Sequence, residues 1–234
     1  MQPIASTSRI WELDFLRGLA ILLMVFFHLM FDLNEFFQVP IPYEHGVVYF
    51  IGRLAAVLFI LLAGISCSLS RNNLRRGMKI LAWGLVVTLV TSIAVPGLNI
   101  FFGILHFLGT SILLYHLIHE LRPSLLFILG VLTIATGYAF EQITMPNHLL
   151  APLGLLGDDF YSADYYPLFP WFGLFLWGTA FGKCLYPSKS SLFPGKPAHH
   201  LLSYLGKHSL WIYLLHQPIL LLVLYPIFAL FAGL

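Results

Sequence analysis

Long apolar stretches alternate with short polar connections along the whole chain. A membrane-spanning helix needs about 20 mostly apolar residues. Seven stretches approach that length, and we predict a helix for each of them: 14–33, 47–70, 78–95, 100–120, 124–141, 167–186 and 208–232. Prolines mark the connections, as expected of residues that interrupt helices. The pattern predicts an all-α, polytopic integral membrane protein with about seven transmembrane helices, forming a single domain over residues 1–234.

The composition supports a bilayer as the surrounding solvent. Hydrophobic residues make up 59% of the chain and charged residues only 9%, whereas soluble domains carry roughly 25% charged residues. The first apolar stretch contains Asp14, Arg17 and His28 and is followed by no small-residue cleavage pattern, so we expect a retained helix rather than a signal peptide. Cys67 and Cys184 lie in or near apolar stretches, so no disulfide framework is expected.

The basic residues predict the orientation, because positive charge is retained on the cytoplasmic side. With seven helices and the N-terminus inside, eleven of the twelve Lys and Arg residues fall on the cytoplasmic side, and Arg53 is the exception. The cytoplasmic set is Arg9, Arg17, Arg71, Arg75, Arg76, Lys79, Arg122, Lys183, Lys189, Lys196 and Lys207. The opposite connections carry acidic residues, including Asp32, Glu35, Glu44, Glu141, Asp158, Asp159 and Asp164. We therefore expect a multi-pass protein of the cell membrane with its C-terminus outside.

Polar side chains within the apolar stretches fall on single helix faces. Ionisable groups at membrane depth are costly and are candidates for function. At 100° per residue, Asp14, Arg17, His28 and Asp32 lie within about 60° of one another on the first helix. Three further helices also carry polar stripes: Asn99, Gly103, His106 and Thr110; Ser209, Tyr213, His216 and Gln217; and Arg53 with Tyr49 and His45. Four such stripes predict a shared interior cavity.

A structural interpretation of these groups stays open. Hydrogen bonds from Ser, Thr, Asn, Gln and His side chains can hold a helix bundle together without any other role. That interpretation is weakest for His28 and for Arg53, since arginine keeps its proton and needs an anionic partner or water; Asp32 is one candidate partner. Positive-inside topology alone explains the cluster Arg71, Arg75, Arg76 and Lys79, although such residues also bind phosphate.

Four blocks of the sequence resemble the transmembrane acyltransferase superfamily. This superfamily includes the acyltransferase type 3 proteins and the catalytic domain of heparan-α-glucosaminide N-acetyltransferase. The first block is widely shared, and the other three are most similar to the heparan-acetyltransferase catalytic domain of small bacterial proteins. In chain order they are 9–20 (RIWELDFLRGLA, continuing to His28), 103–109 (GILHFLG), 164–173 (DYYPLFPWFG) and 206–218 (GKHSLWIYLLHQP).

The resemblance implies transfer of an acyl group, expected to be acetyl, from acyl-CoA to a hydroxyl or amine of a saccharide-type acceptor. The catalytic first-helix histidine of the type 3 proteins is matched here by His28. The heparan enzyme's important histidine lies just beyond its first helix, and His45 is the nearest counterpart. The implied partners are acyl-CoA, the acceptor and the lipid bilayer; no nucleic acid and no metal are expected, and a homodimer stays open.

The chemistry of acyl transfer is compatible with what the resemblance implies, because it needs a base and donors for the developing oxyanion. His28 suits the role of base, and Asp32, one turn later, is a candidate to orient it. Arg53, Tyr213 and His216 are candidate oxyanion donors, and His45 is a further catalytic candidate. For acetyl-CoA binding we expect Asp14, Arg17, Arg71, Arg75, Arg76, His106, Ser209 and Tyr213. His28 lies about 16 Å beyond Arg17 along a helix, a span suited to an extended pantetheine arm.

Two other functions remain open at this stage. A small-solute transporter or channel lined by the polar stripes should show inverted repeats with broken helices, and we find no such repeat in the sequence. A haem protein should offer matched histidine pairs on two helices. His106 and His119 are suitably spaced on one helix, but no second helix carries a matching pair.

Overall fold

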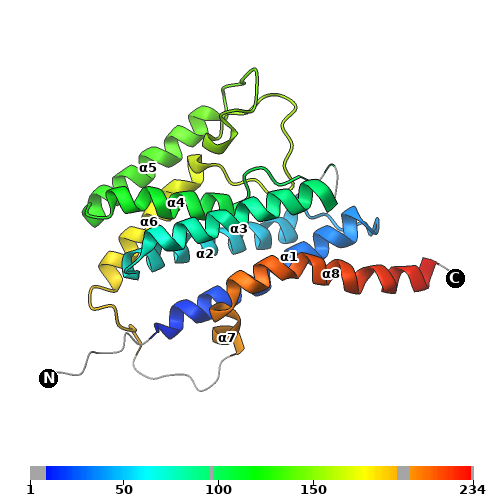
Figure 1. The fold of residues 1–234 in the computed structure, drawn as a ribbon, viewed down its shortest axis with the longest axis horizontal. Coiled ribbons are helices and arrows are strands. Elements are labelled where there is room, and N and C mark those ends of the chain that lie inside the picture. Colours follow the sequence, from blue (N-terminus) through cyan, green and yellow to red (C-terminus); the bar gives the residue numbers. More distant parts are fainter. Residues whose placement is uncertain (1–8, 95–96, 98, 194–200, 233–234) are drawn as a thin grey trace. The chain divides into compact units, whose positions relative to one another are not determined.

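The computed structural model is helical throughout the part of the chain that it describes, residues 9–94, 97, 99–193 and 201–232 (Figure 1). Lys196 lies outside these residues, as does the predicted end of the third helix at residue 95. The helices are α1 (Trp11–Glu35), α2 (Gly46–Leu69), α3 (Asn73–Ala94), α4 (Ile104–Ile118), α5 (Pro123–Phe140), α6 (Leu168–Leu185), α7 (Leu201–Lys207) and α8 (Ser209–Ala232), with a 3₁₀ turn η1 (Ala151–Leu153). The all-α prediction is confirmed for this part of the chain.

Each predicted stretch corresponds to one long helix, but not every helix is a strong membrane candidate. Five described helices are long and apolar enough to cross a bilayer: α1, α2, α3, α5 and α8. The helix α4 spans only 15 residues, and α6 contains a non-helical residue, Phe169, near its start. Large apolar side chains are exposed, including Ile93 at 74% and Leu222 at 75%, as expected where lipid is the solvent. The chain is thus a multi-pass membrane protein, and the count of seven spans stays a prediction.

One predicted boundary changes, and one helix was not predicted, each for an identifiable reason. The fourth helix starts at Ile104 rather than at residue 100, because the backbone before it pairs with the connection that precedes α6: Asn99 and Phe102 accept hydrogen bonds from Ala163 and Tyr166. The sequence pattern also missed α7, a seven-residue helix. It is too short to produce a recognisable apolar stretch.

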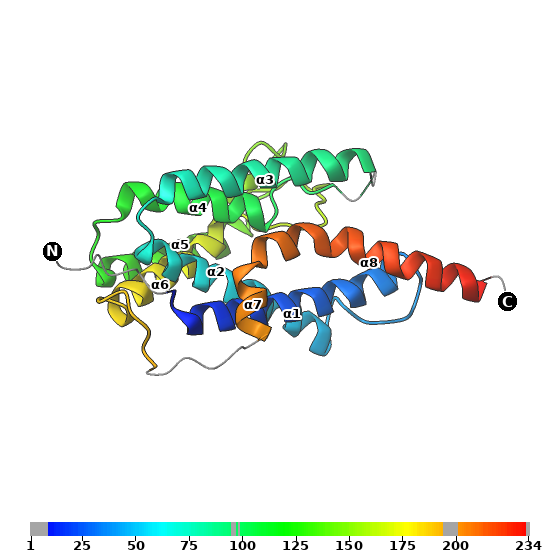
Figure 2. The same ribbon diagram turned by 60° about the horizontal axis from the view of Figure 1, so that its bottom comes forward.

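The chain forms two compact units, and α2 contributes to both. The first unit contains residues up to Phe59 and residues from Ser190 onward, and so includes α1, the start of α2, α7 and α8. In this unit α7 and α8 both contact α1, and α7 crosses α1 near its N-terminal end (Figure 2). Its apolar core is formed by Ile21, Met24 and Ala55, against which Ile212 and Tyr213 pack.

The second unit, residues 60–189, is built from two helix pairs, α3 with α4 and α5 with α6. Glycines allow these helices to approach closely, as is common in membrane bundles. A Cβ atom built at Gly109 would lie 2.6 Å from the Leu81 backbone nitrogen, and one at Gly173 would meet the Gly130 carbonyl oxygen. Side chains larger than hydrogen at these two positions would therefore push the paired helices apart.

The connections of the second unit gather at opposite ends according to their charge. At the basic end, the Lys183 amine donates to the carbonyls of His119 and Leu121, 2.6 Å away in each case. At the acidic end, Asp164 accepts a 2.9 Å hydrogen bond from the Ile104 backbone N–H at the start of α4. Near it, the Tyr165 hydroxyl donates to the Ala151 carbonyl at 2.7 Å, and burial raises the pKa of this phenol. The orientation that the charges predicted stays a prediction.

Candidate active site

Two histidines of the first unit contact each other edge to face. One lies on α1 and the other on α8, the two long helices of this unit whose polar stripes include a histidine. The rings of His28 on α1 and His216 on α8 have their centroids 4.6 Å apart, with an angle of 78° between the ring planes. His216 is buried, with 8% exposure, while His28 is half-buried. The core around Met24 and Tyr213 packs one helical turn before the pair. The polar stripes of these two helices therefore face each other, while the cavity shared by four stripes stays a prediction.

The hydrogen bonds of both histidines fix which ring nitrogen carries the proton. The Nδ1 atom of His28 lies 3.0 Å from the Met24 carbonyl oxygen, and the Nδ1 atom of His216 lies 2.6 Å from the Tyr213 carbonyl oxygen. A carbonyl oxygen only accepts, so each neutral ring donates from Nδ1 and keeps a lone pair on Nε2. Both rings thus present a basic nitrogen, and the Nε2 atom of His216 is buried without a hydrogen-bond partner among the described residues.

Next to the histidines lies a carboxylate held by an amide. Asp32, one turn after His28, is fully buried. Its Oδ1 atom accepts a hydrogen bond from the Gln217 side-chain amide, while its Oδ2 atom and the Gln217 Oε1 atom find no partner within the described structure. Asp32 is therefore bound to Gln217 rather than to Arg53, the partner that the sequence suggested. His28 likewise donates its orienting hydrogen bond to the Met24 carbonyl rather than to Asp32.

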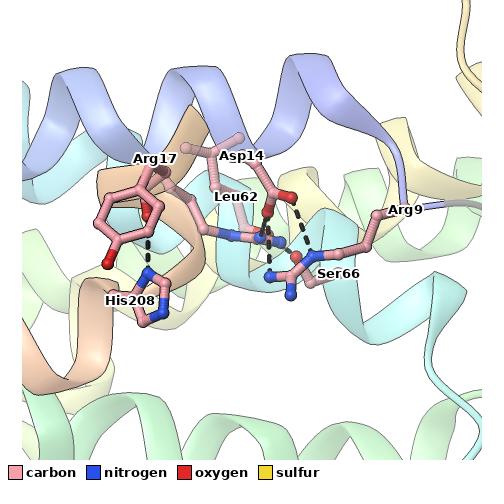
Figure 3. Close-up of polar contacts among 7 residues, drawn as sticks. Arg9, Asp14, Arg17, Leu62, Ser66 and His208 are labelled. Carbon is pink, nitrogen blue, oxygen red and sulfur yellow. Dashed lines mark hydrogen bonds and ion pairs between the residues drawn. The ribbon is translucent and has the colours of Figure 1, made fainter. Parts of the chain in front are cut away.

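At the opposite end of α1, two arginines converge on one buried carboxylate (Figure 3). Asp14 is 2% exposed, and its oxygens lie 2.9 Å from Arg9 Nε and 2.6 Å from Arg17 Nη1. The two guanidinium groups and the Asp14 carboxylate together carry one net positive charge, and the nearby carboxylate of Glu12 on α1 offsets it. Asp14 therefore positions both arginine side chains. Arg17 and Asp14 were both predicted as acetyl-CoA contacts, and they form one ion-paired group.

The helix α7 and residues 191–192 hold this end of α1 in place. A Cβ atom built at Gly206 would overlap the Asp14 carbonyl oxygen, so only glycine allows α7 to pack this closely. The buried carboxylate of Glu12 accepts hydrogen bonds of 2.8 Å from the Ser191 hydroxyl and from the Leu192 backbone N–H. These contacts hold the backbone that carries Arg9, Asp14 and Arg17.

The other predicted residues of the first unit lie on α2, directly before α2, or on α8. Arg53 is exposed on α2, and its Nε atom donates to the Tyr49 hydroxyl at 2.9 Å. His45 is exposed directly before α2, and Ser209 is half-buried at the first residue of α8. Tyr213, one turn later, is half-buried and supplies the carbonyl that fixes His216.

The remaining predicted residues belong to the second unit. Arg71 and Arg75 are exposed at the connection between α2 and α3, and Arg76 is half-buried with its Nη1 atom 3.8 Å from Cys67 Sγ. His106 is buried on α4, where its Nε2 atom lies 3.1 Å from the Thr88 hydroxyl. Because the Thr88 hydroxyl itself donates to a carbonyl, His106 donates from Nε2 and holds α3 against α4.

Sequence reasoning missed two residues of the site region. Gln217 was noted in the polar stripe of the last helix but was not assigned a role, since its spacing from Asp32 along the chain says nothing about contact. Glu12 was also left without a role, although an acidic residue so close to the membrane signals a buried partner.

Comparison with known proteins gives one family match. The model of the family described as "Heparan-alpha-glucosaminide N-acetyltransferase, catalytic" matches residues 9–218. No curated protein and no solved structure matches the chain. The matched range contains α1 and all of the residues that surround the His28 and His216 pair.

Proposed function

The chain belongs to the heparan-α-glucosaminide N-acetyltransferase catalytic family, and from this we propose that it moves an acetyl group from acetyl-CoA to a hydroxyl or amine of a saccharide-type acceptor. The family match confirms the resemblance found in the sequence and makes the chain a member of a membrane acetyltransferase family. The donor, the acceptor and the residues that act on them are our proposal.

The observation that carries the mechanism is the hydrogen bond that His28 Nδ1 donates to the Met24 carbonyl. The hydrogen bond from Nδ1 to the Met24 carbonyl holds this imidazole in the tautomer that accepts a proton at Nε2. General bases of this kind accelerate proton transfer by about 10²- to 10⁴-fold. We assign the base to His28 because it is the less buried of the two rings. His216 packs against it and restricts its orientation.

The proposed reaction balances with these groups alone. His28 Nε2 takes the proton of the acceptor N–H or O–H as the acceptor atom bonds to the acetyl carbonyl carbon. The carbon–sulfur bond then breaks, and the CoA thiolate receives the same proton from the imidazolium. Tyr213 and Arg53 are the candidate donors to the oxyanion. His216 is a poor candidate for that role, because its free nitrogen is an acceptor while Nδ1 already donates to Tyr213.

Acetyl-CoA would place its phosphates at the basic end of α1. Arg9 and Arg17 lie there, and charge-assisted hydrogen bonds to phosphate are strong. Arg17 precedes His28 by eleven residues, about 16 Å along the helix axis. Arg71, Arg75 and Arg76, which belong to the second unit, stay candidates for phosphate binding because of their charge. With seven spans and the N-terminus inside, this end faces the cytoplasm of a cell-membrane protein.

Transfer of radiolabelled acetyl from acetyl-CoA to D-glucosamine by the purified protein tests the proposal. His28→Gln preserves size and polarity but removes the basic nitrogen, so we expect kcat to fall about 100-fold or more. Acetyl-CoA binding, measured by calorimetry, should be unchanged.

His116→Gln is the matched control, since His116 is exposed at the far end of α4 and should leave both quantities unchanged. Full activity in His28→Gln would refute the assigned base. Solute flux through proteoliposomes without acetyl-CoA, together with no binding of acetyl-CoA, would refute the acetyltransferase itself.

A further inference from the structure

Three hydrogen-bond acceptors near the histidine pair are buried and unpaired within the described residues. They are Asp32 Oδ2, Gln217 Oε1 and His216 Nε2. The first two belong to side chains bound to each other, and the third belongs to the residue before Gln217. No donor among the described side chains satisfies any of the three.

Burying an acceptor without a donor is costly, since the group loses its hydrogen bonds to water and gains none in return. A single such atom is common. Here three such atoms belong to side chains that lie close together, one of them is a carboxylate oxygen, and all three need a hydrogen-bond donor. Such a group favours a molecule that brings several N–H or O–H donors. A saccharide does so, because several neighbouring carbons of its ring carry hydroxyl groups.

We propose that Asp32, His216 and Gln217 form the recognition site for the acceptor saccharide and bind the hydroxyl donors that neighbour its reacting group; this rests on the proposed function. These side chains accept hydrogen bonds from the saccharide through Oδ2, Nε2 and Oε1. Gln217 also positions Asp32, because its amide holds Oδ1 and thereby directs Oδ2. His28, one turn before Asp32, is placed to take the proton of the neighbouring nucleophile.

The variant Asp32→Asn separates recognition from folding. Its Oδ1 atom still accepts the hydrogen bond from Gln217, but its second atom becomes an N–H donor and the charge is lost. Gln217→Met keeps the length of the side chain and removes the amide. The purified protein is assayed with acetyl-CoA and two acceptors: D-glucosamine, which has hydroxyls beside its amine, and cyclohexylamine, which has none.

We expect kcat/KM of the wild type to be at least about tenfold higher for glucosamine than for cyclohexylamine. One hydrogen bond to a charged group is sufficient for such a ratio. Both variants should reduce this ratio to near one by raising KM for glucosamine. KM for acetyl-CoA should be unchanged. Asp158→Asn and Gln142→Met, at exposed positions between α5 and α6, are the matched controls and should retain the ratio.

Thermal stabilisation by glucosamine without acetyl-CoA gives a readout independent of turnover: the wild type should be stabilised, and Asp32→Asn should not. A selectivity ratio retained in both variants, or no stabilisation of the wild type by glucosamine, overturns this inference. If the wild type still binds acetyl-CoA in that case, the proposed function is supported. If the wild type does not bind acetyl-CoA, the proposed function itself is contradicted.

Discussion

Two buried carboxylates of α1, Asp14 and Asp32, have different hydrogen-bond partners, and we infer different roles for them from this difference. Asp14 is paired with two arginines, so its charge is balanced and its oxygens are occupied. Asp32, five turns later, has one hydrogen bond from an amide and one buried oxygen without a partner in the described structure. We infer that Asp14 stabilises the protein and positions Arg17, while Asp32 is available to a ligand.

Asp14→Ala should therefore weaken both stability and acetyl-CoA binding. The change leaves a half-buried Arg17 and an exposed Arg9 without their anion, and the loss of a partly buried ion pair costs about 2 kcal/mol. We expect a fall in Tm of about 5 °C in detergent, measured by thermal unfolding. Arg9→Ala, which removes the more exposed partner, should lower Tm less. Equal effects of the two variants would contradict the assigned role of Asp14.

At the scale of helices, glycine decides which elements approach each other. The contact of α7 with α1 depends on Gly206 and Gly18, where built Cβ atoms would overlap backbone carbonyl oxygens of the opposite helix. These contacts lie beside Asp14 and Arg17. The packing of a seven-residue helix therefore fixes the part of α1 that we assign to the CoA phosphates.

Gly206→Ala should separate α7 from α1. Forcing an added methyl group into a well-packed contact costs about 1–3 kcal/mol, so we expect a lower Tm and a higher KM for acetyl-CoA. Ala139→Val, at an exposed position on α5, adds volume without a clash and serves as control. Unchanged stability and KM in Gly206→Ala would show that the contact between α7 and α1 contributes little.

At the scale of the whole molecule, charge and hydropathy determine how the chain inserts. The basic connection between α4 and α5 contacts the end of α6, through Lys183 and the carbonyls of His119 and Leu121. The acidic connection before α6 contacts the start of α4, through Asp164. Such segregation is what the positive-inside rule requires of an alternating bundle.

Reporter fusions test the resulting topology. Green fluorescent protein joined after Arg122 should fluoresce, because we place that connection in the cytoplasm. Alkaline phosphatase joined after Gly157 or at the C-terminus should be active, because both sites lie outside in a seven-span arrangement. A fluorescent C-terminal fusion would instead require an even number of spans.

The sequence by itself determined the helical class, the approximate bounds of the long helices and the family. These depend on local properties, since about 20 apolar residues must form a helix in lipid and motifs such as 9–20 are contiguous. It also placed His28 and Asp32 on one face of their helix through the helical period alone.

Only the tertiary structure decided the partners of these groups. Gln217 rather than Arg53 binds Asp32, carbonyls of Met24 and Tyr213 set both histidine tautomers, and α7 packs on α1. The physical reason is that a hydrogen bond depends on distances of about 3 Å between atoms. Residues 185 positions apart in the chain acquire such distances only when helices pack, and no local pattern records which pairs will meet.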